Sequence, residues 1–289
     1  MILSNTTKAA EFLPSLNLSV DNTRFNDFFR GAQEWLVCHI IGEDIEDVLE
    51  EAIPEGQEDQ HLDLRTHCQR VIAEIALLKV VPEMDMQLTE AGFAVQNNDN
   101  FSPASSQRVD RLIAKMPERI ASDVDALVRF LMKNSIDDGA YGDWRDSEQF
   151  KYLTSAFIPL CEVFTAYCSG LQPDKKPSMK YDDFYASIPL MARELRNVAD
   201  YYVSRAEIDR LLGMYRDNSL QEIHRKAIVC LEDCAVAALR YNMAQARNAA
   251  VCARDIMLDN LGDFPAFAAS PASSRKDISI DGGKTVNFL

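Results

Sequence analysis

The sequence lacks the common motifs of nucleotide-binding and hydrolytic enzymes. It contains no glycine-rich phosphate loop, no Gly-x-Ser-x-Gly nucleophile elbow and no His-Glu-x-x-His metal motif. The Glu-x-x-His spacing that carboxylate-bridged metal sites place on helices occurs from Glu58 to His61, in a Gly- and Gln-rich stretch where no helix is expected. The sequence therefore predicts no catalytic residue, no cofactor and no bound metal.

Long uncharged segments are also missing. No stretch reaches the roughly 18 uncharged residues that a membrane-spanning helix requires. The first residues, MILSNTTKAAEFL, lack the basic start and the continuous apolar run of a secretory signal peptide. We therefore expect a protein that is made in the cytoplasm and does not enter a membrane.

Positive charge is scarce. The 289 residues include 30 Lys and Arg against 45 Asp and Glu, a formal net charge of −15, which argues against binding through the phosphate backbone of nucleic acids. No Lys or Arg occurs between Gly31 and Leu64, where six acidic residues crowd one short segment: Glu43, Asp44, Glu46, Asp47, Glu50 and Glu51. Such a run is typical of a solvated helix face. The alternative is a repulsive surface past which DNA moves without adhering.

The seven cysteines do not suggest a disulfide framework. Their number is odd, and all of them fall in apolar stretches with helical spacing, which predicts small buried thiols in a reducing compartment. Two Cys–His neighbours, Cys38 with His39 and His67 with Cys68, raise the question of a zinc site. Adjacent residues on a helix point about 100° apart, so one member of each pair should face away, and we do not predict zinc.

Apolar residues recur three and four positions apart over most of the chain, which predicts a mainly α protein built as a helical bundle. A Gly- and Asp-rich stretch from Asn134 to Asp143 is the expected boundary between two helical domains, 1–134 and 144–262. An extended C-terminal tail, 263–289, is expected to follow.

Two capping boxes predict helix starts in the second domain. The first runs from Ser204 to Glu207 and the second from Ser219 to Glu222. His224 follows the second box closely, which favours a role at the end of that helix over a role as a metal ligand.

Residues 85–96 depart from the helical pattern. Met86 and Leu88 alternate with polar neighbours, Phe93 and Val95 alternate after a short turn that ends at Gly92, and this predicts a β-hairpin inserted between helices. A two-stranded ribbon is marginally stable in water, so its apolar side should pack on the protein's own helices or on a second copy.

The tail carries four widely spaced apolar residues that are too few for a core of their own: Phe264, Phe267, Val286 and Phe288. The alternation of apolar residues about a Gly-Gly turn suits pairing with an existing sheet edge. Such a tail either frays in solution or docks on another surface. If the protein assembles, we expect the tail to dock on an adjacent subunit or on another partner in the assembly, with little hydrogen-exchange protection before assembly.

The segment from Asp85 to Ile113 resembles a family of phage and prophage proteins from gut Bacteroidales. The shared order is an aspartate-led strand, L-T-x-x-G-F-x-V, an Asn-rich loop, P-A-S and R-V-x-R-L-I, and a weaker similarity extends to Trp144–Phe150 and to the residues around Tyr201–Ser204. The family is similar to the head-tail connector adaptors, or head-completion proteins, of tailed phages.

The resemblance implies a structural protein of the virion. It implies a homo-oligomeric ring, with a dodecamer expected, that lies below the portal and contacts portal and tail proteins while DNA passes through without specific binding. The final location would be the neck of the virion, after synthesis in the cytoplasm of the bacterial host. Two alternatives stay open at this point: a cytosolic helical interaction protein, and an all-α carboxylate metalloenzyme.

Overall fold

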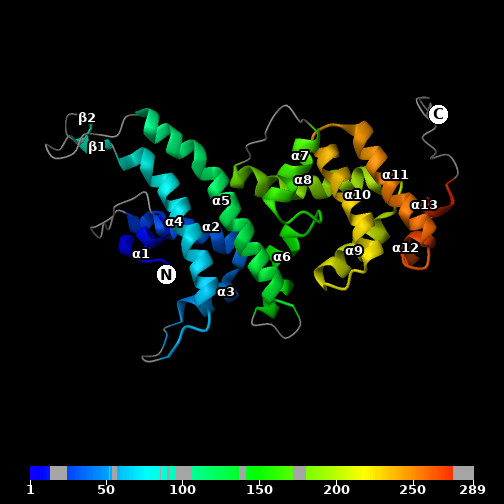
Figure 1. Ribbon diagram of the computed structural model, residues 1–289, viewed down its shortest axis with the longest axis horizontal. Helices are drawn as coiled ribbons and strands as arrows, with labels where there is room; N and C mark the ends of the chain where they lie inside the picture. The colour runs from blue at the N-terminus through cyan, green and yellow to red at the C-terminus, as the bar shows by residue number, and fades with distance from the viewer. Residues whose placement is uncertain are drawn as a thin grey trace. The chain divides into compact units, whose positions relative to one another are not determined.

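The computed structural model describes residues 1–13, 25–51, 53, 57–84, 86–89, 92–95, 106–136, 141–171 and 180–275. The chain forms two compact units: unit 1 is Met1–Leu153, Leu160–Thr165 and Lys176–Tyr185, and unit 2 is Thr154–Pro159, Ala166–Lys175 and Ala186–Leu289. Helices dominate the described residues (Figure 1), which confirms the mainly α class predicted from the apolar spacing.

Unit 1 is built around a pair of long helices. Its described elements are α1 (Thr6–Phe12), α2 (Asn26–Leu36), the π-helix η2 (Val37–Ile41), α3 (Glu43–Glu50), α4 (Leu62–Met84), the strands β1 (Met86–Thr89) and β2 (Gly92–Val95), α5 (Ser106–Asn134), the 3₁₀-helix η3 (Gly142–Asp146) and α6 (Glu148–Leu153). The first turns of α7 (Cys161–Leu171) and α8 (Tyr181–Ala199) also belong to unit 1.

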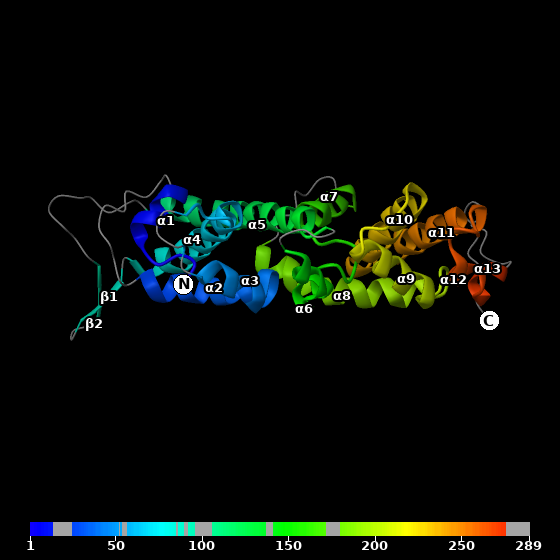
Figure 2. The ribbon, with the colours of Figure 1, turned by 90° about the horizontal axis from the view of Figure 1, so that it is seen from below.

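The core of unit 1 lies where α2 and α5 pack on α4 (Figures 1 and 2). Side chains at helical spacing point into it and are fully buried, among them Val71 and Ile75 of α4 and Val124, Leu127 and Leu131 of α5. Burial of each such side chain contributes roughly 1.5–3 kcal/mol of gross hydrophobic stabilisation. These are the stripes that the sequence pattern predicts.

A short π-helix and a glycine connect α2 to α3. The helical hydrogen bonding widens to a π-helix in η2, a form that usually appears as a short bulge. Gly42 then takes φ +79°, a left-handed conformation that favours glycine, and α3 begins at the next residue. The indole Nε1 of Trp144 donates a hydrogen bond of 2.7 Å to the Ile40 carbonyl inside η2.

The two strands pair antiparallel, with Met86 opposite Val95 and Leu88 opposite Phe93. β1 follows α4, and Figures 1 and 2 draw the ribbon past the end of that helix. The side chains of β1 and β2 lie outside the described residues. Where the apolar side of the ribbon packs is therefore still a prediction.

Unit 2 is a second helical bundle. Besides the later turns of α7 and α8 it contains α9 (Arg205–Arg216), α10 (Glu222–Leu239), α11 (Met243–Asp259), α12 (Pro265–Ala268) and α13 (Pro271–Ser274). α10 and α11 form an antiparallel helical hairpin (Figure 1) that buries small residues between its helices, including Ala227, Ala246 and Ala253. Small side chains permit this close approach of the two backbones.

The two units divide the chain later than the Asn134–Asp143 stretch. The segment from η3 through α6 belongs to unit 1. Its large side chains are buried there: Trp144 is hydrogen-bonded to η2, and its ring lies tilted against that of Phe150 at a centroid distance of 4.8 Å. Contacts between residues that are more than 100 positions apart in the sequence are not visible in local composition. Within the described ranges, no helix combines the length and the apolar character needed to cross a membrane.

Candidate functional site

The acidic segment predicted to be a functional surface is the helix α3. Glu43, Asp44 and Glu46 occupy its first turn, where carboxylates interact favourably with the helix dipole and where Gly42 offers no side-chain cap. Five of the six acidic residues are exposed: Glu43, Asp44, Asp47, Glu50 and Glu51. α3 thus presents a negatively charged surface, and part of that charge also has a local structural role.

Two of the six acidic residues are tied to the fold of unit 1. The side-chain amide of Gln33 donates hydrogen bonds to Glu46 Oε1 at 2.5 Å and to Glu50 Oε1 at 2.7 Å. Glu50 also forms an ion pair of 2.8 Å with the Met1 amino group. The hydrogen bonds from that amino group and from Gln33 lower the pKa of Glu50, so it stays ionised.

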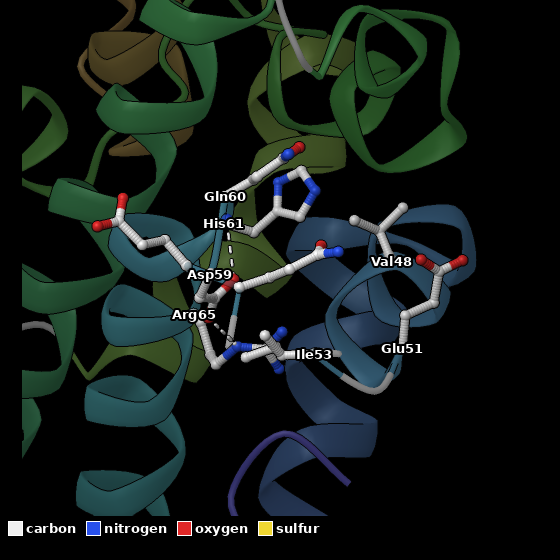
Figure 3. A pocket seen from close by; sticks show the side chains of 9 residues that line it. Val48, Glu51, Ile53, Asp59, Gln60, His61 and Arg65 are labelled. Atoms are coloured by element: carbon white, nitrogen blue, oxygen red, sulfur yellow. Dashed lines mark hydrogen bonds and ion pairs between the residues drawn. The ribbon is translucent and has the colours of Figure 1, made fainter. Parts of the chain in front are cut away.

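A pocket of about 280 Å³ lies between the end of α3 and the start of α4 (Figure 3). Its lining comes from α3 and the residues that follow, and from the turn before α4: Val48, Glu51, Ile53, Gln57, Glu58, Asp59, Gln60, His61 and Arg65. This pocket contains the Glu-x-x-His spacing, which the structure places outside any helix, as the sequence predicts.

Arg65 joins the two sides of this pocket. Its Nε donates to Asp59 Oδ2 at 2.7 Å (Figure 3). Its Nη1 donates to the Leu49 carbonyl in the last turn of α3. Burial opposes ionisation of Asp59, but the hydrogen bonds from Arg65 and from the His61 backbone outweigh it and lower the pKa of Asp59. Asp59 and Arg65 therefore hold the pocket wall together as an ion pair.

Histidine and cysteine do not gather into a ligand set in the part of the chain that the structure describes. His61 Nδ1 lies 3.0 Å from the Tyr141 hydroxyl, and His39 Nδ1 lies 2.8 Å from the Trp35 carbonyl. Cys38 is exposed while Cys68 is fully buried, so the two Cys–His neighbours of the sequence point into different environments.

The prediction of seven buried cysteines is wrong for part of the set. Cys68, Cys161, Cys168 and Cys234 are buried, whereas Cys38 and Cys252 are exposed and Cys230 is half-buried. The apolar spacing of a helix predicts its buried face, but residues at the edge of that face can still be exposed to solvent.

The prediction of an extended tail is wrong for residues 263–275. Proline occupies the first helical position of both α12 and α13, where its fixed φ suits the first turn of a helix. Phe264 and Phe267 are fully buried in unit 2, so they are not available to a neighbouring subunit. Val286 and Phe288 lie outside the described residues.

Side chains of α9 and α10 hold the start of this segment on unit 2. The buried carboxylate of Glu207 accepts a hydrogen bond of 2.8 Å from the Phe267 backbone N–H, and it pairs with Arg210 at 2.7 Å. Arg210 also donates to the Asp263 carbonyl at 2.7 Å, and His224 Nε2 lies 3.0 Å from the same oxygen. The segment is therefore fixed by polar contacts as well as by its two phenylalanines.

The two predicted capping boxes have different outcomes. Ser204 accepts a hydrogen bond from the Glu207 N–H, as expected, but the Glu207 carboxylate turns into the core instead of returning to the Ser204 backbone. α10 begins two residues later than predicted, with Gln221 as N-cap, and its reciprocal partner is His224. The structural role predicted for His224 at a helix end is confirmed.

Sequence reasoning missed three acidic residues that are almost completely buried: Glu74, Asp125 and Glu207. Asp125 accepts hydrogen bonds of 2.8 Å from the Cys161 and Glu162 N–H groups at the start of α7, and burial raises its pKa to about 6. The burial of Glu74 could have been predicted, because this residue interrupts the apolar run Val-Ile-Ala-Glu-Ile-Ala-Leu in α4.

Glu74 belongs to a charged cluster between α4 and α5. It forms an ion pair with Arg119, and Arg70 lies 3.9 Å from Asp123. Burial, together with the neighbouring Asp123 carboxylate, raises the pKa of Glu74. These residues, with Phe12 and Ser122, line a second pocket of about 320 Å³ in unit 1.

Residues 38–154 match a family of unknown function (DUF6712). The match covers less than half of the chain, and it includes α3, the pocket before α4, the paired strands and α5 through α6. No curated protein and no solved structure matches the chain.

Proposed function

We propose that the protein is a structural component of a phage virion, a head-tail connector that assembles into a ring below the portal. The main support is the resemblance of the Asp85–Ile113 segment to virion proteins of Bacteroidales phages and prophages. That segment lies inside the part of the chain that matches a family of unknown function.

The observation that carries the proposal is the register of the two strands. Positions that face each other across an antiparallel pair lie on one face of it, as do positions two apart along a strand. Met86 pairs with Val95 and Leu88 with Phe93, so the four apolar positions of the ribbon share one face. A two-stranded ribbon with an apolar face needs a partner surface, and an adjacent subunit of a ring provides one.

The acidic helix α3 supports the same proposal. The exposed acidic residues of α3 and its C-cap carry the same charge sign as DNA: Glu43, Asp44, Asp47, Glu50 and Glu51. On the channel side of a ring they would repel the phosphate backbone, so that DNA slides past without the counterion release that stabilises bound complexes.

The first test is assembly. The protein at micromolar concentration, alone and with the purified portal of the same phage, should form rings that mass photometry sizes and negative-stain imaging displays. A subunit that stays monomeric even with the portal present would refute the connector function. The same result would favour a cytosolic interaction protein.

The second test concerns the charge of α3. Reversing Glu43, Asp44 and Asp47 to Lys should leave assembly intact and create salt-dependent DNA binding by the rings, measured by fluorescence anisotropy of a labelled duplex. A matched control reverses three exposed aspartates of unit 2, Asp217, Asp255 and Asp259. Equal DNA binding by both variants would show that net charge matters and that α3 has no special position.

A further inference from the structure

Two cysteine thiols lie in contact on the surface of the α10–α11 hairpin. The Sγ atoms of Cys230 and Cys252 are 2.7 Å apart, while a disulfide bond requires about 2.05 Å. Cys252 is exposed and Cys230 is half-buried. The two sulfur atoms therefore lie within about 0.7 Å of bonding distance.

The register of the hairpin is fixed independently of the thiols. Gln245 Nε2 donates a hydrogen bond of 2.9 Å to Asp233 Oδ1, three residues from Cys230 on the same helix. α10 ends at Leu239 and α11 begins at Met243, so a short turn joins the two helices. Because both helices are long and tightly packed, the two thiols stay near each other in the reduced protein.

We propose that Cys230 and Cys252 form a reversible disulfide that links α10 to α11 when the protein meets an oxidant. The oxidant is a small-molecule disulfide of the glutathione class. The exposed Cys252 reacts first: its thiolate attacks one sulfur of the small disulfide, the S–S bond breaks, and one small thiol leaves. Cys230 then attacks Cys252 Sγ and releases its proton to water, and the second small thiol leaves. Two protein thiols are oxidised and one disulfide is reduced to two thiols.

The environment of Cys230 suits a thiol that reacts second, by attacking the mixed disulfide on Cys252. Burial and the adjacent Cys252 raise the pKa of Cys230 to about 12, so it remains a protonated thiol until a neighbouring mixed disulfide forms. The other cysteine on α10 close to it, Cys234, is fully buried and out of reach of an oxidant. The bond should therefore form between Cys230 and Cys252 only.

The disulfide would stabilise unit 2 by closing a loop between residues 22 positions apart. Oxidation should raise the thermal midpoint of unit 2 by roughly 5–10 °C, and a dithiol reductant should reverse the shift. This inference does not depend on the connector function, since it concerns the stability of one subunit.

The experiment treats the full chain with millimolar oxidised glutathione and counts free thiols after denaturation. In the Cys38→Ser variant, which lacks the other exposed thiol, the expected count falls from six to four. Tryptic peptides 227–240 and 248–254 should appear as one linked species that is lighter than their sum by two hydrogen atoms. Fragment ions assign the bond to Cys230, because Cys234 lies in the same peptide.

Two variants make the result specific. Cys252→Ser should abolish both the linked peptide and the thermal shift, whereas Cys38→Ser, which removes an exposed cysteine of unit 1, should retain them. Six free thiols after oxidation of Cys38→Ser would overturn the proposal. A stable adduct of glutathione on Cys252, with Cys230 still free, would overturn it as well.

Discussion

The buried carboxylate of Glu207 should be the main polar anchor of the C-terminal helices. Replacing it by Ala leaves the Phe267 N–H without an acceptor inside the protein and leaves Arg210 without its counter-charge. Breaking a buried ion pair from one side costs about 3–5 kcal/mol. The Arg210 side chain is 28% exposed, so water compensates part of the loss and we expect about 3 kcal/mol.

A graded pair of variants separates charge from shape. Glu207→Gln keeps the size of the side chain and an oxygen that accepts from the Phe267 N–H, but it loses the charge and replaces the oxygen that faces Arg210 by an amide NH2 group. Its cost should be about 1 kcal/mol, the difference between a charged and a neutral acceptor. The surface variant Glu222→Ala is the control, because Glu222 is exposed and pairs only with Lys226 one turn away, and no measurable change is expected.

Hydrogen exchange gives the direct readout for this prediction. In the native protein the amides from Phe267 to Ser270 should be protected, in contrast to the expectation from sequence that protection ends near Asp263. A loss of about 3 kcal/mol corresponds to a fall in protection of roughly 100-fold for Glu207→Ala. The reasoning is refuted if Glu207→Ala changes these amides no more than Glu222→Ala does.

Three further predictions follow from other contacts. Asp125→Ala should destabilise unit 1 by about 2 kcal/mol in urea denaturation because α7 loses its cap, and Asp125→Asn should cost less; equal costs would argue against the cap. Burial raises the pKa of Glu232 from 4.5 to about 7 despite its hydrogen bond from Tyr167, so its stabilising contribution is complete below pH 4.5 and is lost as the pH rises through 7. Glu232→Gln should therefore flatten the fall in thermal midpoint between pH 5 and about pH 8, and an unchanged slope would contradict the assignment. If the connector function is right, Phe93→Asp should abolish rings while it leaves the thermal midpoint of the subunit nearly unchanged, whereas a large drop in that midpoint would assign the ribbon to its own helices.

The helices were predictable because their signal is local. In α5, Val124, Leu127 and Leu131 repeat at the spacing of one helix face, and that pattern is sufficient to place the helix and its buried side. The serine cap at Ser204 was predictable for the same reason, since donor and acceptor lie within one turn.

The candidate sites were harder to predict because they depend on contacts between distant segments. Glu207 looked like the second half of a capping box, but its partner is the backbone of Phe267, 60 positions away. Cys230 and Cys252 had no recognisable spacing, because the turn that brings them together sets their register. The contact of Trp144 with η2 is of the same kind, since its two partners lie 104 positions apart.

The hydrogen bond from Trp144 to η2 has a practical consequence for spectroscopy. The chain contains two tryptophans, and both Trp35 and Trp144 belong to unit 1. Trp144 is buried, and Trp35 packs edge-on against Tyr181 at a centroid distance of 5.0 Å, so both indoles sense the packing of that unit. Intrinsic fluorescence excited selectively at tryptophan therefore reports the unfolding of unit 1 alone, while circular dichroism reports the helices of both units. Two transitions that fail to coincide would give the separate stability of each unit from one sample of unmodified protein.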